Sequence, residues 1–178
     1  VGVRKDENGY VTSLVGQLHG KYEADLFIDC TGFGSHLLEK EMGSKFVSYK
    51  PWLDNDRAVV TPVKYTDKEK QLKNVTTCTG LNNGWVWNTP TWDKMGRGYV
   101  YSSDFVDDDT AEEELKRHLG TDDVDVRKIN IRHGIHEKGW VKNVVGIGLA
   151  YAFVEPLEST SLVSTHDLLF QIVELLDR

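Results

Sequence analysis

The chain has 178 residues, and its 21 lysine and arginine residues against 28 aspartate and glutamate residues give a formal net charge of −7. This balance argues against a nucleic-acid surface, and no apolar run reaches the roughly 18 residues that a membrane helix needs. The two cysteines are too few for a disulfide framework and are typical of a reducing compartment. We therefore expect a cytoplasmic protein with no nucleic-acid and no membrane partner.

The first part of the chain reads as short strands separated by turns. Strands are expected at residues 1–3, 10–18 and 22–28, and the last of them continues into a buried strand over 24–30. Gly32 and Gly34 follow, ahead of a short helix over 35–42. They partly fit a dinucleotide-binding fingerprint, but Leu37 occupies its third glycine position and a hairpin precedes the strand. The glycines either serve a cofactor or only turn the chain.

The middle of the chain is predicted to form an antiparallel sheet. Apolar segments at 58–65, 74–79, 84–88 and 98–102 are separated by clusters of glycine, asparagine, proline and aspartate. Trp85 and Trp87 are two residues apart, so they share one face of their strand, where aromatic core packing is the ordinary explanation. A surface helix is expected over 107–120, with acids at its start, basic residues at its end and Gly120 closing it.

Metal binding is not predicted. A strand is expected at 126–131, and His133 and His136 follow it. Their separation of three places them on opposite faces of an extended chain, and neither cysteine is near them in sequence. The acidic stretch from Asp54 to Asp56 lacks the glycine and the terminal glutamate of a calcium loop.

The stretch 144–162 combines the most informative features. An apolar run over 144–147 predicts a buried strand, and Gly146 and Gly148 end it. Pro156 interrupts the next segment, after which a helix with a buried face is predicted to run to about residue 176. The start of a helix favours a bound anion, yet Glu158 lies just before it. Either Ser159, Thr160 and Ser161 cap the helix, or the turn has a chemical role.

These segments resemble one family. The sequence Glu155-Pro156-Leu157-Glu158-Ser159-Thr160 is similar to the segment before the active-site helix of flavin-dependent tryptophan halogenases. The stretch 84–90 resembles the Trp-x-Trp-x-Ile-Pro motif of the same family, with Thr89 in place of isoleucine, and residues 25–32 resemble its later flavin-contacting strand.

The resemblance implies a fold of the α+β or α/β class. It would be part of an FAD/NAD(P)-binding, flavin monooxygenase-like fold, with an antiparallel sheet and a long C-terminal helix. Residues 1–178 would form one domain within a larger flavin module. The phosphate-binding glycine loop, the catalytic lysine and the C-terminal substrate region would lie outside this sequence.

The resemblance also implies the reaction. In this family, FAD reduced by a separate flavin reductase reacts with oxygen and a halide, and the resulting oxidant halogenates an aromatic, indole-like or phenol-like substrate. Chloride, bromide and iodide are all considered, and a homodimer is possible. The alternatives are a flavin-dependent monooxygenase of the same fold and a non-catalytic fragment.

Residue roles follow by position. Glu158 is expected to be catalytic, and Thr160 and Ser161 are expected to bind halide through a helix start. Flavin contacts are expected from Thr31, Gly32, Gly148, Leu149, Ser159 and Leu162. Separation of flavin from substrate is expected from Trp85, Trp87 and Pro90.

Overall fold

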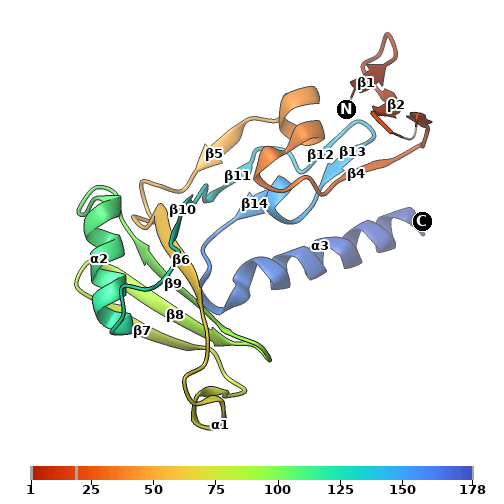
Figure 1. Ribbon diagram of the computed structural model, residues 1–178. Coiled ribbons are helices and arrows are strands. Elements are labelled where there is room, and N and C mark those ends of the chain that lie inside the picture. Colours follow the sequence, from red (N-terminus) through yellow and green to blue (C-terminus); the bar gives the residue numbers. More distant parts are fainter. Residues whose placement is uncertain (1, 19, 178) are drawn as a thin grey trace. The chain divides into compact units, whose positions relative to one another are not determined.

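The computed structural model describes residues 2–18 and 20–177, except for the side chain of Glu158, and divides into two compact units. The terminal unit combines Val1–Tyr49 with Arg132–Arg178, and the central unit is Lys50–Ile131. Helices and mainly antiparallel sheets occur together, as expected (Figure 1). None of the described helices is both long enough and apolar enough to span a bilayer.

The terminal unit contains three sheets of three strands each. The first is an antiparallel meander of β1 (Gly2–Lys5), β2 (Val11–Gly16) and β3 (Gly20–Tyr22). The second is antiparallel and places β11 (Gly134–His136) between β5 (Phe46–Ser48) and β14 (Ala152–Phe153). The third places β13 (Val144–Gly146) between β12 (Trp140–Val141) and β4 (Phe27–Asp29).

The pairing of β4 with β13 is parallel and joins two segments far apart in sequence, with Phe27 opposite Val144 and Asp29 opposite Gly146. Phe27 and Val144 are buried in a common apolar cluster with Val11 and Leu37. A Cβ at Gly146 would lie 2.5 Å from a methyl group of Leu38. Glycine is therefore required where the π-helical turn His36–Glu41 packs on β13.

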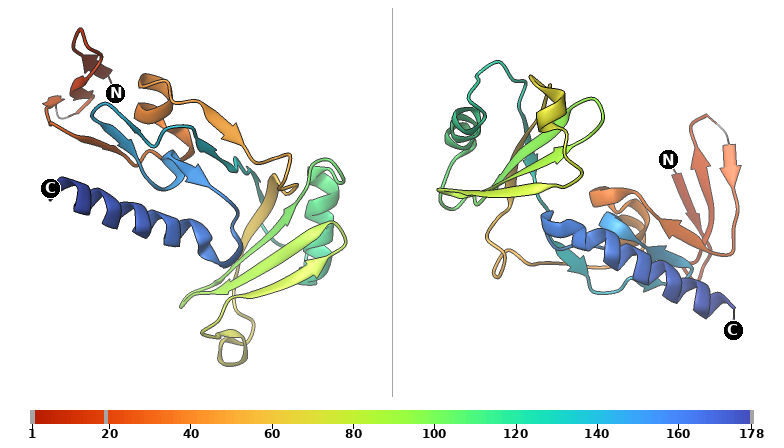
Figure 2. Two further views of the ribbon diagram at one scale, coloured as in Figure 1. Left: turned by 180° about the vertical axis from the view of Figure 1, so that it is seen from behind. Right: turned by 90° about the horizontal axis from the view of Figure 1, so that it is seen from below.

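The central unit is one antiparallel sheet in the order β10-β6-β9-β8-β7. Its strands are β6 (Arg57–Val63), β7 (Thr77–Leu81), β8 (Gly84–Pro90), β9 (Met95–Tyr101) and β10 (Arg127–Asn130). The helix α2 (Asp108–Leu119) lies against one face of this sheet, whereas the short α1 (Lys68–Gln71) is in the loop before β7 (Figure 2). The shared core includes Val59, Tyr99 and Leu115.

The ends of α2 match the prediction from its charges. Asp107 caps the first turn by accepting the backbone N–H of Thr110, and Gly120 closes the helix with φ of 71°. Glu114 is an exception to the prediction of a surface helix. Its carboxylate is buried, accepts the hydroxyl of Tyr99 at 2.7 Å, and also accepts the backbone N–H of Asn82 at 3.0 Å.

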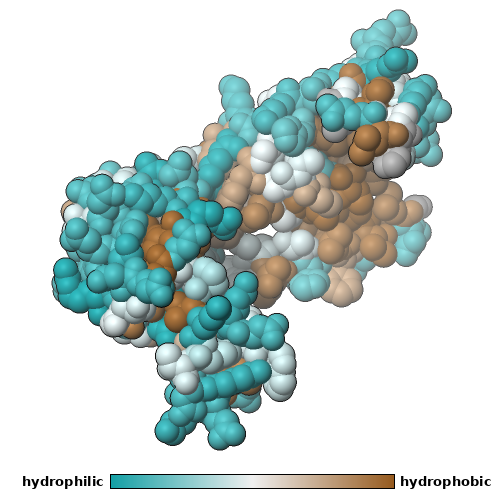
Figure 3. Space-filling model, in the orientation of Figure 1, coloured by the Kyte–Doolittle hydropathy of each residue, from teal (hydrophilic) through white to brown (hydrophobic). Residues whose placement is uncertain are grey.

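The helix α3 (Thr160–Leu176) occurs where a long C-terminal helix was predicted, but its burial differs from the prediction. Ile172 is its only buried residue within the described part of the helix. Leu162 and Phe170 are 62% and 70% exposed. Apolar side chains thus gather on the surface over α3 (Figure 3).

Candidate functional site

Two glycine-containing turns lie side by side in the terminal unit. One, Gly32–Gly34, follows β4, and the other, Gly148–Ala150, follows β13, so both leave the carboxyl ends of the parallel strand pair. Gly32 and Gly148 have φ of 66° and 57°, which glycine adopts without strain. The hydroxyl of Ser35 links the turns by donating to the carbonyl of Ala150 at 2.8 Å. The two glycine segments, far apart in sequence, are therefore neighbours in the fold.

Asp29 fixes the first of these turns. Its fully buried carboxylate accepts the backbone N–H groups of Leu37 and Leu38, each at 2.8 Å, and the hydroxyl of Thr31 at 2.6 Å. Burial alone would raise the pKa of Asp29, but these hydrogen bonds outweigh burial and hold the pKa below its usual value. The carboxylate thus holds the chain reversal between β4 and the following π-helical turn.

An ion-pair network contacts the backbone that follows the second turn. Arg132 donates to both carboxylate oxygens of Glu39 at 2.7 and 2.8 Å, and these bonds, with smaller contributions from His136, lower the pKa of Glu39 to about 2. The ring of His136 lies between Glu39 Oε2 at 3.1 Å and the carbonyl oxygen of Tyr151 at 2.8 Å. The network therefore connects Glu39 to the backbone immediately after Gly148–Ala150.

The start of α3 does not have the capping that its sequence indicates. Ser159 has φ of 55° and makes no side-chain cap, and the hydroxyl of Thr160 donates to the carbonyl of Leu157 at 3.2 Å. The hydroxyl of Ser161 is buried without a hydrogen-bond partner in the described part of the chain. Simple capping by these three side chains is therefore wrong, and a buried hydroxyl is left at the first turn.

The predicted flavin-contacting leucines are both accessible. Leu149, in the second glycine turn, is 38% exposed, and Leu162, in the first turn of α3, is 62% exposed. The backbone of Glu158 lies in the helical turn Leu157–Ser159, directly before α3. Its side chain, the predicted catalytic group, lies outside the described residues.

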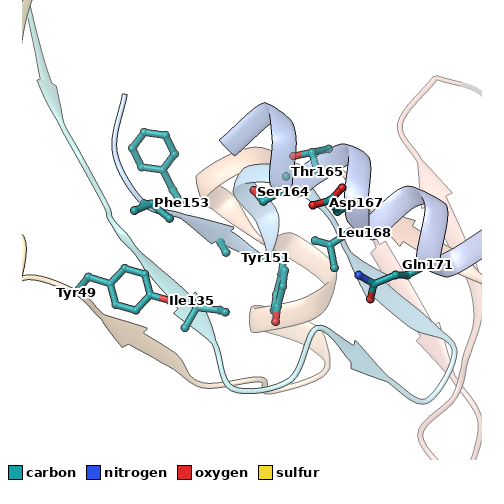
Figure 4. A pocket seen from close by; sticks show the side chains of 12 residues that line it. Tyr49, Ile135, Tyr151, Phe153, Ser164, Thr165, Asp167, Leu168 and Gln171 are labelled. Atoms are coloured by element: carbon teal, nitrogen blue, oxygen red, sulfur yellow. The ribbon is translucent and has the colours of Figure 1, made fainter. Parts of the chain in front are cut away.

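A cavity of about 290 Å³ lies beneath α3, and sequence analysis did not predict it. Tyr151 and Phe153 line one side, and Thr165, Asp167 and Leu168 of α3 line another (Figure 4). Gly148 is also a lining residue. The predicted halide-binding residues Thr160 and Ser161 are not among its described lining residues. The glycine turn therefore lies next to α3 and to a partly open, mainly apolar space.

Trp85, Trp87 and Pro90 all belong to β8 in the central unit. The two indole rings have centroids 6.1 Å apart, which confirms that they share one face. Pro90 is the last residue of the strand, opposite Met95 of β9. These three residues form one local group.

The two histidines that follow β10 differ in their surroundings. Among the described residues, no three histidine, cysteine, aspartate or glutamate side chains are grouped so that they could hold a metal ion. His133 and His136 are both buried. His136 belongs to the ion-pair network, and the ring nitrogens of His133 have no partner within the described residues.

Comparisons with known proteins agree on one family. The family model described as tryptophan halogenase matches residues 1–178. The 7-chloro-L-tryptophan 6-halogenase KtzR of Kutzneria sp. (strain 744) is 39% identical over 97% of this chain and 34% of its own length. The tryptophan 7-halogenase RebH of Lentzea aerocolonigenes is 36% identical over 97% of this chain and 33% of its own length.

Solved structures agree with the sequence comparison. The VirX1 apo structure superposes with a TM-score of 0.93 and 43% identity, covering 100% of this chain and 35% of that one. The tryptophan 6-halogenase SttH of Streptomyces toxytricini has a TM-score of 0.92 and 38% identity, covering 98% and 34%. The chain thus spans about a third of the length of these relatives. Because the family model matches all of its residues, the chain belongs to the tryptophan halogenase family.

Proposed function

We propose that the protein containing this chain is an FAD-dependent halogenase that uses reduced flavin, oxygen and a halide to halogenate an aromatic substrate. The observation that carries the proposal is the pair of glycine turns at the carboxyl ends of β4 and β13. In open α/β sheets, ligands bind in the crevice outside the carboxyl ends of parallel strands. The fold is accordingly proposed to be part of an FAD/NAD(P)-binding, flavin monooxygenase-like module.

The residues at these turns fit a flat, mainly apolar cofactor. A Cβ placed on Gly32 would meet nothing within 4 Å, so its backbone is open to a ligand, and Gly148 is nearly as open. Leu149 and Leu162 offer accessible apolar surface next to Gly148 and Ser159. Thr31, whose hydroxyl is held by Asp29, completes the proposed flavin contacts. When bound, reduced flavin supplies the oxidising chemistry with oxygen.

The start of α3 is proposed to hold the halide. Backbone N–H groups at a helix start attract anions, and the side chains of Ser159 and Thr160 do not cap them. The buried, unpaired hydroxyl of Ser161 is a further hydrogen-bond donor at the same turn. A halide bound through Thr160 and Ser161 would satisfy donors that the described residues leave without an acceptor.

Glu158 is proposed to position the oxidant or to accept the proton that the aromatic ring loses. Its backbone lies directly before α3, next in the chain to the residues of the proposed halide site, and a carboxylate is suited to both roles. Trp85, Trp87 and Pro90 are proposed to keep flavin and organic substrate apart. The tilted indole pair is a rigid apolar wall suited to that task.

The wider assembly is also part of the proposal. Residues 1–178 are taken as one domain of a larger flavin module that contains the glycine loop and the substrate region of the family. A separate flavin reductase is proposed to supply reduced FAD, and a homodimer stays a prediction.

The test is an assay of the intact protein with a flavin reductase, FAD, oxygen and an indole substrate. We expect a halogenated product that requires both halide and reduced flavin. Product that gains oxygen in place of halogen, with flavin consumption independent of halide, would identify a monooxygenase. Failure of the purified protein to retain FAD under any condition would reject a flavin enzyme altogether.

A further inference from the structure

A chain of hydrogen bonds joins the two glycine turns, and it begins at Arg132. The Nη1 group of Arg132 donates to the carbonyl of Phe33, inside the turn Gly32–Gly34, at 3.2 Å. The same guanidinium binds both carboxylate oxygens of Glu39, at 2.7 and 2.8 Å. Arg132 therefore ties the first glycine turn to the π-helical turn that follows it.

His136 continues the chain to the second glycine turn. Its Nε2 is 3.1 Å from Glu39 Oε2, and its Nδ1 is 2.8 Å from the carbonyl oxygen of Tyr151. Since an ionised carboxylate and a carbonyl only accept, each ring nitrogen bonds its neighbour as a donor. The backbone N–H of Tyr151 in turn donates to the carbonyl of Gly148 at 3.0 Å and closes the second turn. The Arg132–Glu39–His136 network thus runs from one turn to the other.

Aromatic rings pack around this network. The centroid of the Phe46 ring lies 3.8 Å from Cζ of Arg132, and the same ring meets His136 edge-on with centroids 5.2 Å apart. Phe33 of the first turn packs at 89° against Phe153 of β14, with ring centroids 5.4 Å apart. The side chain of His136 is only 1% exposed. Because hydrogen bonds with little access to water are electrostatically stronger than exposed ones, the link through His136 is suited to fix a backbone position.

The turns themselves have few means to fix their own positions. Gly32 and Gly148 carry no side chains, and a Cβ placed on either would meet nothing closer than 3.7 Å. Backbone freedom is greatest at glycine, so bonds from neighbouring residues have to hold such turns in place. The hydroxyl of Ser35 supplies one link between the turns, and the Arg132–Glu39–His136 network supplies a second.

We infer that His136 is a positioning residue for the flavin, because through its network it fixes the separation of the two glycine turns. The proposed flavin contacts Gly32 and Gly148 lie on these turns. A site that is already in its bound geometry does not have to be ordered when the ligand binds, which raises affinity. In this role His136 acts through the backbone of Tyr151, and not as a residue that touches the flavin. The inference rests on the proposed function only in naming flavin as the ligand.

The first test measures FAD affinity in His136→Phe of the intact protein, from the change in flavin fluorescence. Phenylalanine keeps a ring against Phe46 and removes both donors, while Arg132 still neutralises Glu39. We expect about tenfold weaker binding of FAD, as the loss of one or two hydrogen bonds of ordinary strength would give. The KM for reduced FAD should rise equally, and the rate at saturating flavin should stay near the parent value. Unchanged affinity would overturn the inference.

The split between KM and kcat separates positioning from general damage to the fold. A fraction of misfolded molecules lowers the rate at saturating flavin and leaves the KM of the remaining molecules unchanged. That result in His136→Phe would overturn the inference. His136→Gln, which keeps one amide donor, should recover part of the affinity.

His133→Phe is the matched control. His133 is similarly buried and lies three residues earlier, and its ring nitrogens have no partner within the described residues. The control variant should bind FAD like the parent. An equal loss of affinity in His133→Phe and His136→Phe would assign the effect to packing near β11 and overturn the role of the network.

A double-mutant cycle tests whether His136 acts through Glu39. Glu39→Gln removes the carboxylate that Arg132 and His136 share. If the residues belong to one network, Glu39→Gln combined with His136→Phe should weaken FAD binding by clearly less than the product of the two single effects. A double effect equal to that product would show that the two residues act independently and would overturn the inference.

Hydrogen exchange without flavin separates this inference from the proposed function. We expect the backbone N–H groups of residues 148–153 to exchange faster in His136→Phe than in the parent or in His133→Phe, because the bond to Tyr151 is lost. Unchanged exchange would overturn the inference whatever the protein binds. A parent that retains no FAD would reject the proposed function, and flavin as the ligand here, while the exchange result would still decide whether His136 positions the turns. Halogenation by the parent, with unchanged FAD affinity in His136→Phe, would reject this inference alone.

Discussion

The carboxylate of Asp29 and the backbone N–H of Leu38 are 2.8 Å apart, and neither is exposed to solvent. The same oxygen also accepts the N–H of Leu37, so two donors converge on one atom at the end of β4. In asparagine, one of the two carboxylate oxygens is replaced by an NH₂ group. The protons of that group would face donors that the carboxylate now accepts. The folded state therefore requires an ionised carboxylate here.

Asp29→Asn is expected to lower the free energy of unfolding by about 2 kcal/mol or more, because buried donors lose charge-assisted hydrogen bonds. Denaturant unfolding of the intact protein measures the change. Asp25→Asn, at an exposed position four residues earlier, is the control and should change stability little. Equal stability of the two variants would show that the carboxylate does not hold this turn.

The Arg132–Glu39–His136 network is expected to make the stability of the protein depend on pH in the acid range. The pKa of Glu39 is lowered from 4.5 to about 2, so its contribution to stability is complete above pH 4.5 and is lost as the pH falls toward 2. Because this carboxylate is 30% exposed, solvent screening limits the contribution to about 1–2 kcal/mol. Glu39→Gln should remove that part of the pH dependence. Glu41→Gln, which removes a carboxylate that pairs with Lys5 outside this network, is the control. Parallel pH profiles for parent and Glu39→Gln would contradict the prediction.

Trp87 is proposed to separate flavin from substrate, and Trp87→Ala should weaken halogenation. The indole covers Gly98, so its loss removes one of the two rings of the proposed barrier. We expect less halogenated product for each reduced flavin consumed, measured by product analysis alongside oxygen uptake. Trp92→Ala removes an indole that is 73% exposed and serves as the control. If Trp87→Ala matches the parent in product yield, flavin affinity and stability, neither a barrier nor a packing role survives.

Much of the local structure could be predicted because it depends on short-range patterns. The caps of α2, the shared face of the two tryptophans and the chain of antiparallel strands follow from propensity, alternation and turn residues. The parallel pairing of Phe27 with Val144 could not be predicted in this way, since 117 residues separate them and nothing local specifies the partner. That pairing is what brings Gly32 and Gly148 together.

The predictions that were wrong or incomplete failed for the same reason, because they depend on partners far apart in the sequence. Glu114 resembles its solvated acidic neighbours in sequence, and only the register of β9 places the hydroxyl of Tyr99 beside it. Likewise His136 was weighed only as a metal ligand, because Glu39, which joins it to Arg132, belongs to a segment about a hundred residues away. The periodicity of α3 correctly predicts a helix, whereas its burial depends on what packs against it. Periodicity alone does not specify that partner.

Ser161 is expected to influence which halide is used. Its hydroxyl is buried and unpaired at the proposed halide site, and Ser161→Gly removes both this donor and the Cβ. The ratio of brominated or iodinated to chlorinated product, measured with equal halide concentrations, should therefore shift between parent and variant. Ser164→Gly is the control, because that hydroxyl already donates to the carbonyl of Ser161 at 3.1 Å. Identical ratios in all three proteins would separate Ser161 from halide selection.

Glu158 carries the sharpest prediction. If it positions the oxidant or takes the proton from the aromatic ring, Glu158→Gln should lower the halogenation rate by about 10²- to 10⁴-fold, the usual range for general-base and electrostatic roles. Folding should be spared, because a charge at a helix end changes stability by only about 0.3–1 kcal/mol. The variant is therefore expected to bind FAD and consume oxygen with a flavin reductase while forming little halogenated product. Glu155→Gln, three residues earlier, is the matched control and should keep the parent rate. Product formation near the parent rate in Glu158→Gln, with only a small drop in melting temperature, would leave Glu158 as a helix-end charge and remove its catalytic role.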